Sequence, residues 1–169
     1  MGLATHPFHQ HITYMSISLK RVRAALEASG ATVNIVETQL ARTAADAASA
    51  VNCDIDQIAK SIIFKGEISN QAILFVTAGS NRVDPIKAAA IAGEALGKAD
   101  AALIRSQTGF AIGGVSPIGH INPIRAFVDP RLTEFNEIWA AAGTPNHVFA
   151  CSPSELINFS KGQVIDFII

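Results

Sequence analysis

Apolar residues recur along the chain with helical spacing in some segments and with strand spacing in others. Between Ser16 and Ser29 small and apolar residues recur at helical spacing, with a serine as N-cap and Gly30 as the stop, which predicts a first helix. The apolar, β-branched runs 60–65 and 72–77 are separated by a polar turn. This pattern predicts a β-hairpin.

Pairs of capping residue and proline mark later boundaries. Asp84-Pro85 and Asp129-Pro130 each place a side chain that can cap free amides before a residue suited to a first helical turn. Further helices are predicted for residues 43–51, 84–92, 98–105 and 152–159, and further strands for 33–37, 124–128, 137–141, 147–150 and 164–167. Because strands and helices alternate irregularly, we expect an α+β fold with a mixed sheet.

Size and composition favour one domain. The chain has 169 residues, of which 49% are hydrophobic, so it can bury a single core. We expect a flexible segment at 1–15 and one domain at 16–169. Its 13 basic residues against 14 acidic ones would not draw it to a polyanion, so nucleic-acid binding would need a local patch. No apolar run approaches a membrane span and the first residues do not resemble a secretion signal, which favours the cytoplasm.

Lys60 is the first candidate for chemistry. On a strand it shares a face with Ile62 and Phe64, because side chains alternate. A lysine on an apolar surface loses hydration and needs a carboxylate, a phosphate or a cavity open to water. Lys60 is therefore a candidate ligand for an anionic substrate. The alternative is a lysine at the start of a strand whose ammonium reaches solvent.

The glycine-rich segment 108–120 is the second candidate. Its glycines and Pro117 describe a backbone that turns sharply and lets a ligand approach closely, with free amides for a carbonyl oxygen or oxyanion. It matches neither a phosphate loop nor a dinucleotide-binding motif. A tight surface loop is the alternative. The candidate binding residues in it are Thr108, Gly109, Gly113, Gly114, Val115, Ser116, Pro117, Gly119 and His120.

Other polar residues carry weaker signals. There is no G-x-S-x-G motif, and Cys53 and Cys151 are interpreted as reduced, packed thiols. Asp129 either caps a turn, anchors the loop or faces a site, whereas His147 is interpreted as structural. The N-terminal histidines His6, His9 and His11 have no metal-binding framework around them. We therefore expect neither a metal nor a cofactor.

Four segments in order resemble one family, the YbaK-like proteins, which are related to the editing domain inserted in bacterial prolyl-tRNA synthetases. The segments are Ala59–Phe64, Gly79–Asp84, Thr108–Gly119 and Phe127–Asp129. The resemblance extends from Ser16 to the C-terminus. It implies a mixed sheet, partly closed into a barrel and flanked by helices, and an enzyme that removes a wrong amino acid from aminoacyl-tRNA in trans.

The resemblance also implies roles for residues. Lys60 matches the lysine that family members need for activity, which would contact the 3′-terminal adenosine. Gly113 and Pro117 match the ends of the family's G-x-x-x-P loop, whose backbone would hold the aminoacyl group. A water would attack the ester, helped by a ribose hydroxyl and the loop amides, without a protein nucleophile. Ser61 and His120 are the candidates for specificity.

The implied partner is the 3′ acceptor end of aminoacyl-tRNA, with tRNA for proline carrying alanine, serine, threonine or cysteine as the favoured substrate. Prolyl-tRNA synthetase is a second candidate partner, whereas DNA and membranes are not expected. Candidate RNA-binding cations are Lys20, Arg21, Arg23, Lys65, Arg82 and Lys87. Two alternatives stay open: a non-catalytic module that binds an aminoacyl group, a nucleotide or a synthetase, and a hydrolase of small esters that does not act on tRNA.

Overall fold

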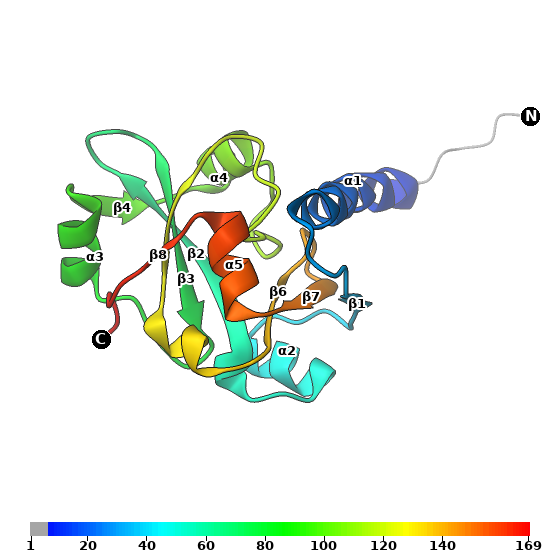
Figure 1. Cartoon of the computed structure of the whole chain (residues 1–169). Coiled ribbons are helices and arrows are strands. Elements are labelled where there is room, and N and C mark those ends of the chain that lie inside the picture. The colour runs from blue at the N-terminus through cyan, green and yellow to red at the C-terminus, as the bar shows by residue number, and fades with distance from the viewer. Residues whose placement is uncertain (1–6) are drawn as a thin grey trace, which may run out of the picture.

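The computed structural model describes residues 7–169, with side chains from Ile17 onward, and centres on a mixed β-sheet (Figure 1). Within this range the sheet has eight strands in the order β1-β7-β6-β2-β3-β5-β8, and β4 also pairs with β2. The strands are β1 (Ile35–Glu37), β2 (Ile58–Gly66), β3 (Ala72–Ala78), β4 (Leu96–Lys98), β5 (Arg125–Val128), β6 (Ile138–Ala141), β7 (His147–Cys151) and β8 (Gln163–Val164).

Helices surround this sheet, and side chains cap most of their N-termini (Figure 1). They are α1 (Pro7–Ser29), α2 (Ala44–Val51), α3 (Pro85–Ala92), α4 (Ala101–Thr108) and α5 (Pro153–Ser160), with short 3-10 helices η1 (Ile55–Gln57) and η2 (Pro130–Glu134). The side chains that accept hydrogen bonds from first-turn amides belong to Thr43, Asp54, Asp84, Asp100, Asp129 and Ser152.

The core divides along the faces of the sheet. On β3, Leu74 and Val76 join the main cluster with residues of α1, α4 and α5, while Ile73 and Phe75 face α3. A third cluster packs α2 against Trp139. Because strand side chains alternate between faces, β3 is buried on both sides and forms the centre of the fold.

Pairing along β2 determines where the site forms. The hairpin β2–β3 is antiparallel and pairs seven positions, from Ala59 with Ala78 to Lys65 with Ala72. On its other edge β2 pairs in parallel with β6 only at residues 58–59, and antiparallel with β4 only at 64–66. Two different strands thus share this edge, with residues 60–63 between them.

The structure confirms the α+β class, the mixed sheet flanked by helices and the hairpin, and α3 has the predicted start at Asp84-Pro85. The first helix was predicted from Ser16 but begins at Pro7, a residue suited to the first helical position. Residues 7–15 of the segment expected to be flexible therefore lie in α1, and residues 1–6 lie outside the described range.

Two further boundaries were wrong. A helix was predicted from Lys98, but Lys98 ends β4, and α4 begins only after its N-cap Asp100. The last strand was predicted at 164–167 and is observed at Gln163–Val164. Searched over the described range, no helix combines the length and the hydropathy that crossing a membrane requires.

Candidate functional site

A cavity of about 370 Å³ lies beside the first half of β2. Its wall comes from α2 and the residues before it, from α4, from the glycine-rich loop at Ile112–Val115, from β6 and from the turn leading into β7. The predicted site residues Lys60, Ser61, Gly113 and Val115 all line it. Segments about eighty residues apart in sequence are therefore brought together around one strand.

Lys60 is half-buried and lines this cavity, and its side chain ends at the loop after β3. Its Nζ donates a hydrogen bond to the carbonyl oxygen of Asn81 at 2.8 Å. Since a lysine has three N–H donors, two remain for a ligand. Burial lowers the pKa of Lys60, as does the charge of Arg82 to a smaller extent, while Asp56 and Asp129 oppose that shift.

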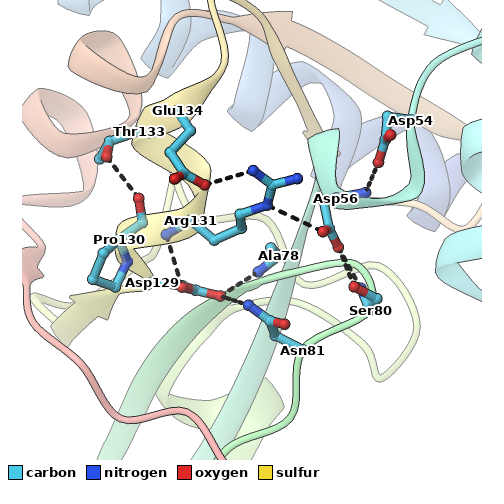
Figure 2. A network of polar contacts seen from close by, with 10 residues as sticks. All are labelled: Asp54, Asp56, Ala78, Ser80, Asn81, Asp129, Pro130, Arg131, Thr133 and Glu134. Atoms are coloured by element: carbon cyan, nitrogen blue, oxygen red, sulfur yellow. Dashed lines mark hydrogen bonds and ion pairs between the residues drawn. The ribbon is translucent and has the colours of Figure 1, made fainter.

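Asp129 fixes Asn81, whose carbonyl oxygen accepts the hydrogen bond from Lys60. Figure 2 shows the contacts of Asp129. Its Oδ2 accepts hydrogen bonds from the side-chain amide of Asn81 at 2.9 Å and from the backbone N–H of Ala78 at 3.0 Å. Its Oδ1 accepts from the backbone N–H of Arg131 at 2.9 Å, and the residue is 2% exposed. Asp129 does not line the cavity, so it acts as an anchor of the loop after β3.

Asp56 binds Ser80 of the same loop, the one after β3, from the side opposite Asp129 (Figure 2). It accepts hydrogen bonds from the backbone N–H and the hydroxyl of Ser80, and from Nε of Arg131 at 3.2 Å. The hydroxyl of Ser80 is the main cause of the lowered pKa of Asp56. A Cβ on Gly79 would collide with the carbonyl oxygen of Ile55, so the loop needs glycine there. The carbonyl that receives Lys60 is fixed from two directions.

The glycine-rich loop forms part of the opposite wall. Gly113 has φ of +92°, which favours glycine, and its Cβ position is open. A Cβ on Gly114 would lie 2.9 Å from the carbonyl oxygen of Gly143 and 3.0 Å from Cα of Thr144. Gly114 therefore lets two cavity-lining loops touch backbone to backbone.

Replacing Gly114 by alanine is expected to separate these two loops, because backbone atoms at that spacing cannot yield as a flexible side chain does. We expect the activity that the family resemblance implies, removal of the amino acid from charged tRNA, to fall about tenfold or more, in keeping with the rate losses that follow a displaced catalytic geometry. Steady-state kinetics on charged tRNA measure this rate. Gly93→Ala is the control for a glycine replaced away from the cavity: Gly93 ends α3 with open space at its Cβ position, and its positive φ, which Gly114 does not share, confines any strain to that helix end. Equal activity of both variants would contradict the role of Gly114.

The rest of the predicted glycine-rich set lies outside this cavity. Thr108 is buried, and its hydroxyl donates to the carbonyl oxygen of Ile104 at 2.6 Å. Ser116 is also buried, with its hydroxyl accepting from Ile118 N–H at 3.3 Å. Pro117, Gly119 and His120 line a separate hollow beside α5.

His120 is part of the packing beneath the loop. Its Nε2 lies 2.7 Å from the carbonyl oxygen of Ser116, its ring packs edge-on against Phe110, and burial lowers its pKa. The structure does not bring it to the cavity that contains Ser61. Ser61 itself lines the cavity, and its hydroxyl makes no hydrogen bond within the described residues.

Sequence reasoning missed the wall opposite β2. From the sequence, His147 was interpreted as structural, but it lines the cavity, and its Nδ1 lies 2.6 Å from the hydroxyl of Thr144. Thr144 follows Gly143, whose φ is +94°, so a glycine before Thr-Pro was the available signal for a special loop. Arg42 and Trp139 also line the cavity and carried no sequence signal of their own.

The candidate RNA-binding cations divide into two groups. Arg21 donates to the carbonyl oxygens of Gly119 at 2.8 Å and Gly109 at 2.7 Å, and its Cζ stands 4.5 Å from the ring centroid of Phe110. Lys87 pairs with Asp166 at 2.9 Å. Arg21 therefore serves the fold. The other group is open to solvent: Lys20, Arg23, Arg82 and Lys87 are exposed, and Lys65 is half-buried.

Both cysteines are free thiols in the structure. Burial raises the pKa of Cys151 to about 12, and burial likewise raises the pKa of Cys53, so neither is an activated nucleophile. Over the described residues, no three histidine, cysteine or acidic side chains gather as metal ligands would. The side chains of His6, His9 and His11 lie outside that description.

Comparisons with known proteins bear on the same region. Residues 38–159 match the family described as the aminoacyl-tRNA editing domain. The uncharacterised protein YwhH of Bacillus subtilis (strain 168) is 31% identical over 149 residues, which are 88% of this chain and 94% of that protein.

Solved structures agree with this match. One, a proposed trans-editing enzyme for prolyl-tRNA synthetase, is 42% identical, with a TM-score of 0.84 over 90% of this chain and 97% of the other. Another, a hypothetical protein, is 25% identical, with a TM-score of 0.80 over 88% and 99% of the two chains.

Proposed function

The chain belongs to the aminoacyl-tRNA editing domain family and is an aminoacyl-tRNA deacylase, and from this premise we propose that it clears errors of prolyl-tRNA synthetase in trans. Its substrate would be tRNA for proline carrying a small wrong amino acid. Support comes from the similarity to the proposed trans-editing enzyme for that synthetase. The observation that carries the proposal is the cavity that Lys60 and the glycine-rich loop both line.

In this proposal Lys60 contacts the 3′-terminal adenosine of the tRNA. Its ammonium is anchored on the Asn81 carbonyl and keeps donors for the ligand. The aminoacyl group enters the cavity between β2 and the loop at Ile112–Val115. A water attacks the ester carbon, aided by a ribose hydroxyl, and the loop amides stabilise the charge that develops on the carbonyl oxygen. The bond from the ester carbon to the ribose oxygen then breaks, and that oxygen takes up the proton that the water loses, which releases the free amino acid and the tRNA.

A second site of limited size can remove smaller amino acids that the pocket of a synthetase fails to reject. Side chains that differ by one methylene are separated by only about 1–3 kcal/mol in a single pocket, so smaller amino acids escape the first selection. Besides polar residues such as Arg42, Lys60 and His147, the cavity is walled by small or branched apolar side chains and by Trp139. Such a wall suits alanine, serine, threonine or cysteine.

The test is hydrolysis of tRNA for proline charged in turn with alanine, serine, threonine, cysteine and proline, by the purified protein at fixed salt. Release of one or two small amino acids, with Pro-tRNA spared, is the expected result. No release from any of them would overturn the assignment to prolyl-tRNA errors. If uncharged tRNA fails to compete, a small-ester hydrolase is favoured, and binding without turnover would favour a module that only binds.

The pH dependence of ligand binding should report on Lys60. Its pKa lies below the ordinary value of 10.5, so the ammonium deprotonates earlier as pH rises, and affinity should fall before a free lysine would titrate. Calorimetric titration of a stable amide analogue, 3′-alanylamido-3′-deoxyadenosine, from pH 7 to 10 measures this.

Lys60→Arg is the control for that titration, because its guanidinium keeps its charge across the range. The ligand's own amine titrates identically with both proteins, so only the difference between the two curves counts. We expect the decline to move to higher pH in the variant. Superimposable curves would contradict a charged Lys60 at the ligand.

A further inference from the structure

The cavity meets β2 along its edge. Six consecutive residues, Ile58–Ile63, line it. A strand that presented one face would contribute alternate residues only, because successive side chains point to opposite sides. An unbroken run means that the backbone of the strand itself borders the cavity.

Strand pairing leaves this stretch of edge open. Pairing with β6 ends at Ala59, and pairing with β4 starts at Phe64. Among the described residues no strand continues the ladder along 60–63 on this side. Backbone N–H and C=O groups in a partly buried position need hydrogen-bond partners, so an open edge inside a cavity is a place for a ligand.

Two hydrogen bonds show which backbone groups point into the gap. Gly66 N–H donates to the carbonyl oxygen of Gln71, toward β3, whereas Glu67 N–H donates to that of Ala95, toward β4. Successive residues of a strand direct their backbone groups to opposite edges. Odd-numbered residues of β2 therefore face the cavity edge, and these include Ser61 and Ile63.

We propose that this open edge binds the aminoacyl group of the substrate as one residue of a parallel ladder, a subsite that deepens the proposed function and rests on it. In a parallel ladder a residue donates its N–H to the carbonyl before its neighbour and accepts from the N–H after it. The α-ammonium of the substrate then donates to the Ser61 carbonyl, and the ester carbonyl oxygen accepts from the Ile63 N–H. The substrate continues the place that β6 occupies beside Ile58 and Ala59.

This arrangement gives selectivity for the atoms that all amino acids share. The edge recognises the ammonium and the carbonyl of a single amino-acid residue, independent of the side chain. The side chain of the substrate then contacts apolar residues of the cavity wall, among them Ile104, Val115 and Ala140, which select it by size. The loop at Gly113 lies over the opposite side of the same group.

Nuclear magnetic resonance of the 15N-labelled protein tests the contact directly, with 3′-alanylamido-3′-deoxyadenosine as the probe. The Ile63 amide proton should move downfield on binding, more than those of Ile62 and Phe64, which face β3. A probe with a propionyl group in place of alanyl lacks the ammonium and should bind about tenfold more weakly or worse. Binding that shifts the Gly113–Val115 amides and leaves Ile63 unchanged would overturn the proposal.

Replacing single residues by their α-hydroxy acids removes one N–H and leaves the side chain. At Ile63 this should lower kcat/KM for deacylation about 100-fold, the loss typical of a donor to a developing oxyanion. Ile35 is the matched control: Ala150 N–H donates to the carbonyl oxygen of Asn34, so by the same alternation the Ile35 N–H points away from β7 at the outer edge of the sheet.

The two proposals fail in different ways. If the unmodified protein hydrolyses none of the charged tRNAs, the proposed function fails. If it hydrolyses them and the hydroxy acid at Ile63 changes kcat/KM no more than the one at Ile35, the edge subsite alone is wrong.

Discussion

Lys60→Ala is expected to lower kcat/KM for deacylation by about two orders of magnitude, the loss that follows when a contact that positions the substrate, here its 3′-terminal adenosine, is removed. The fold should survive, because Lys60 is only half-buried and its recorded hydrogen bond goes to a carbonyl that the loop holds independently. Single-turnover hydrolysis with excess protein measures the residual rate, and thermal unfolding followed by circular dichroism checks the fold.

Lys98→Ala is the matched control for this variant. Lys98 is an exposed lysine of β4 that pairs with Phe64 of β2 and lies outside the cavity wall. We expect its kcat/KM to stay within about twofold of the parent, as is usual for an exposed substitution without a special contact. Unchanged turnover in Lys60→Ala would remove Lys60 from the site.

Asp129→Ala should have the largest effect on stability. It leaves three donors without an acceptor, the backbone N–H groups of Ala78 and Arg131 and the side-chain amide of Asn81. Each buried donor without a partner costs about 1–3 kcal/mol, and some recover water, so we expect unfolding free energy to fall by about 2–4 kcal/mol. Chemical denaturation measures it, with the exposed cap Asp100→Ala expected to lose clearly less.

Asn81→Ala separates what this hydrogen-bond network contributes to the stability of the fold from what it contributes to activity. It removes the side chain that binds Asp129 but keeps the carbonyl that receives Lys60. The carbonyl is then less firmly placed, so kcat/KM should fall while the protein stays folded. Asn122→Ala, which loses a comparable bond to Gln107 far from the cavity, is its control. If the two variants were equally active, Asp129 would only stabilise the fold.

Local signals in the sequence were sufficient for much of the fold. Capping residues and prolines act within one turn, so Asp84-Pro85 located α3 and Thr43 located the start of α2. The hairpin β2–β3 was predictable because both strands are continuous and close in sequence. β4 is three residues long and forms only against β2, which is why Leu96–Lys98 carried no strand signal.

The site was predictable only where its residues belong to β2 or to the first part of the glycine-rich loop. Lys60 and Gly113 were identified, but Thr144 and His147 reach the cavity because β6 joins β2 in parallel some eighty residues later. That pairing leaves no local pattern. Likewise, nothing in the composition of residues 116–120 shows that they turn beneath the loop toward α5.

Arg21 sets the size of the smallest unit that could carry this activity. It comes from α1, ahead of the segment 38–159 that defines the family match, yet it clamps the carbonyls of Gly109 and Gly119 at the two ends of the glycine-rich loop. A protein trimmed to the matched segment would keep every cavity-lining residue. It would lose the hydrogen bonds from Arg21 that stabilise the glycine-rich loop. A transplant of this editing function into another protein must therefore carry α1 with it.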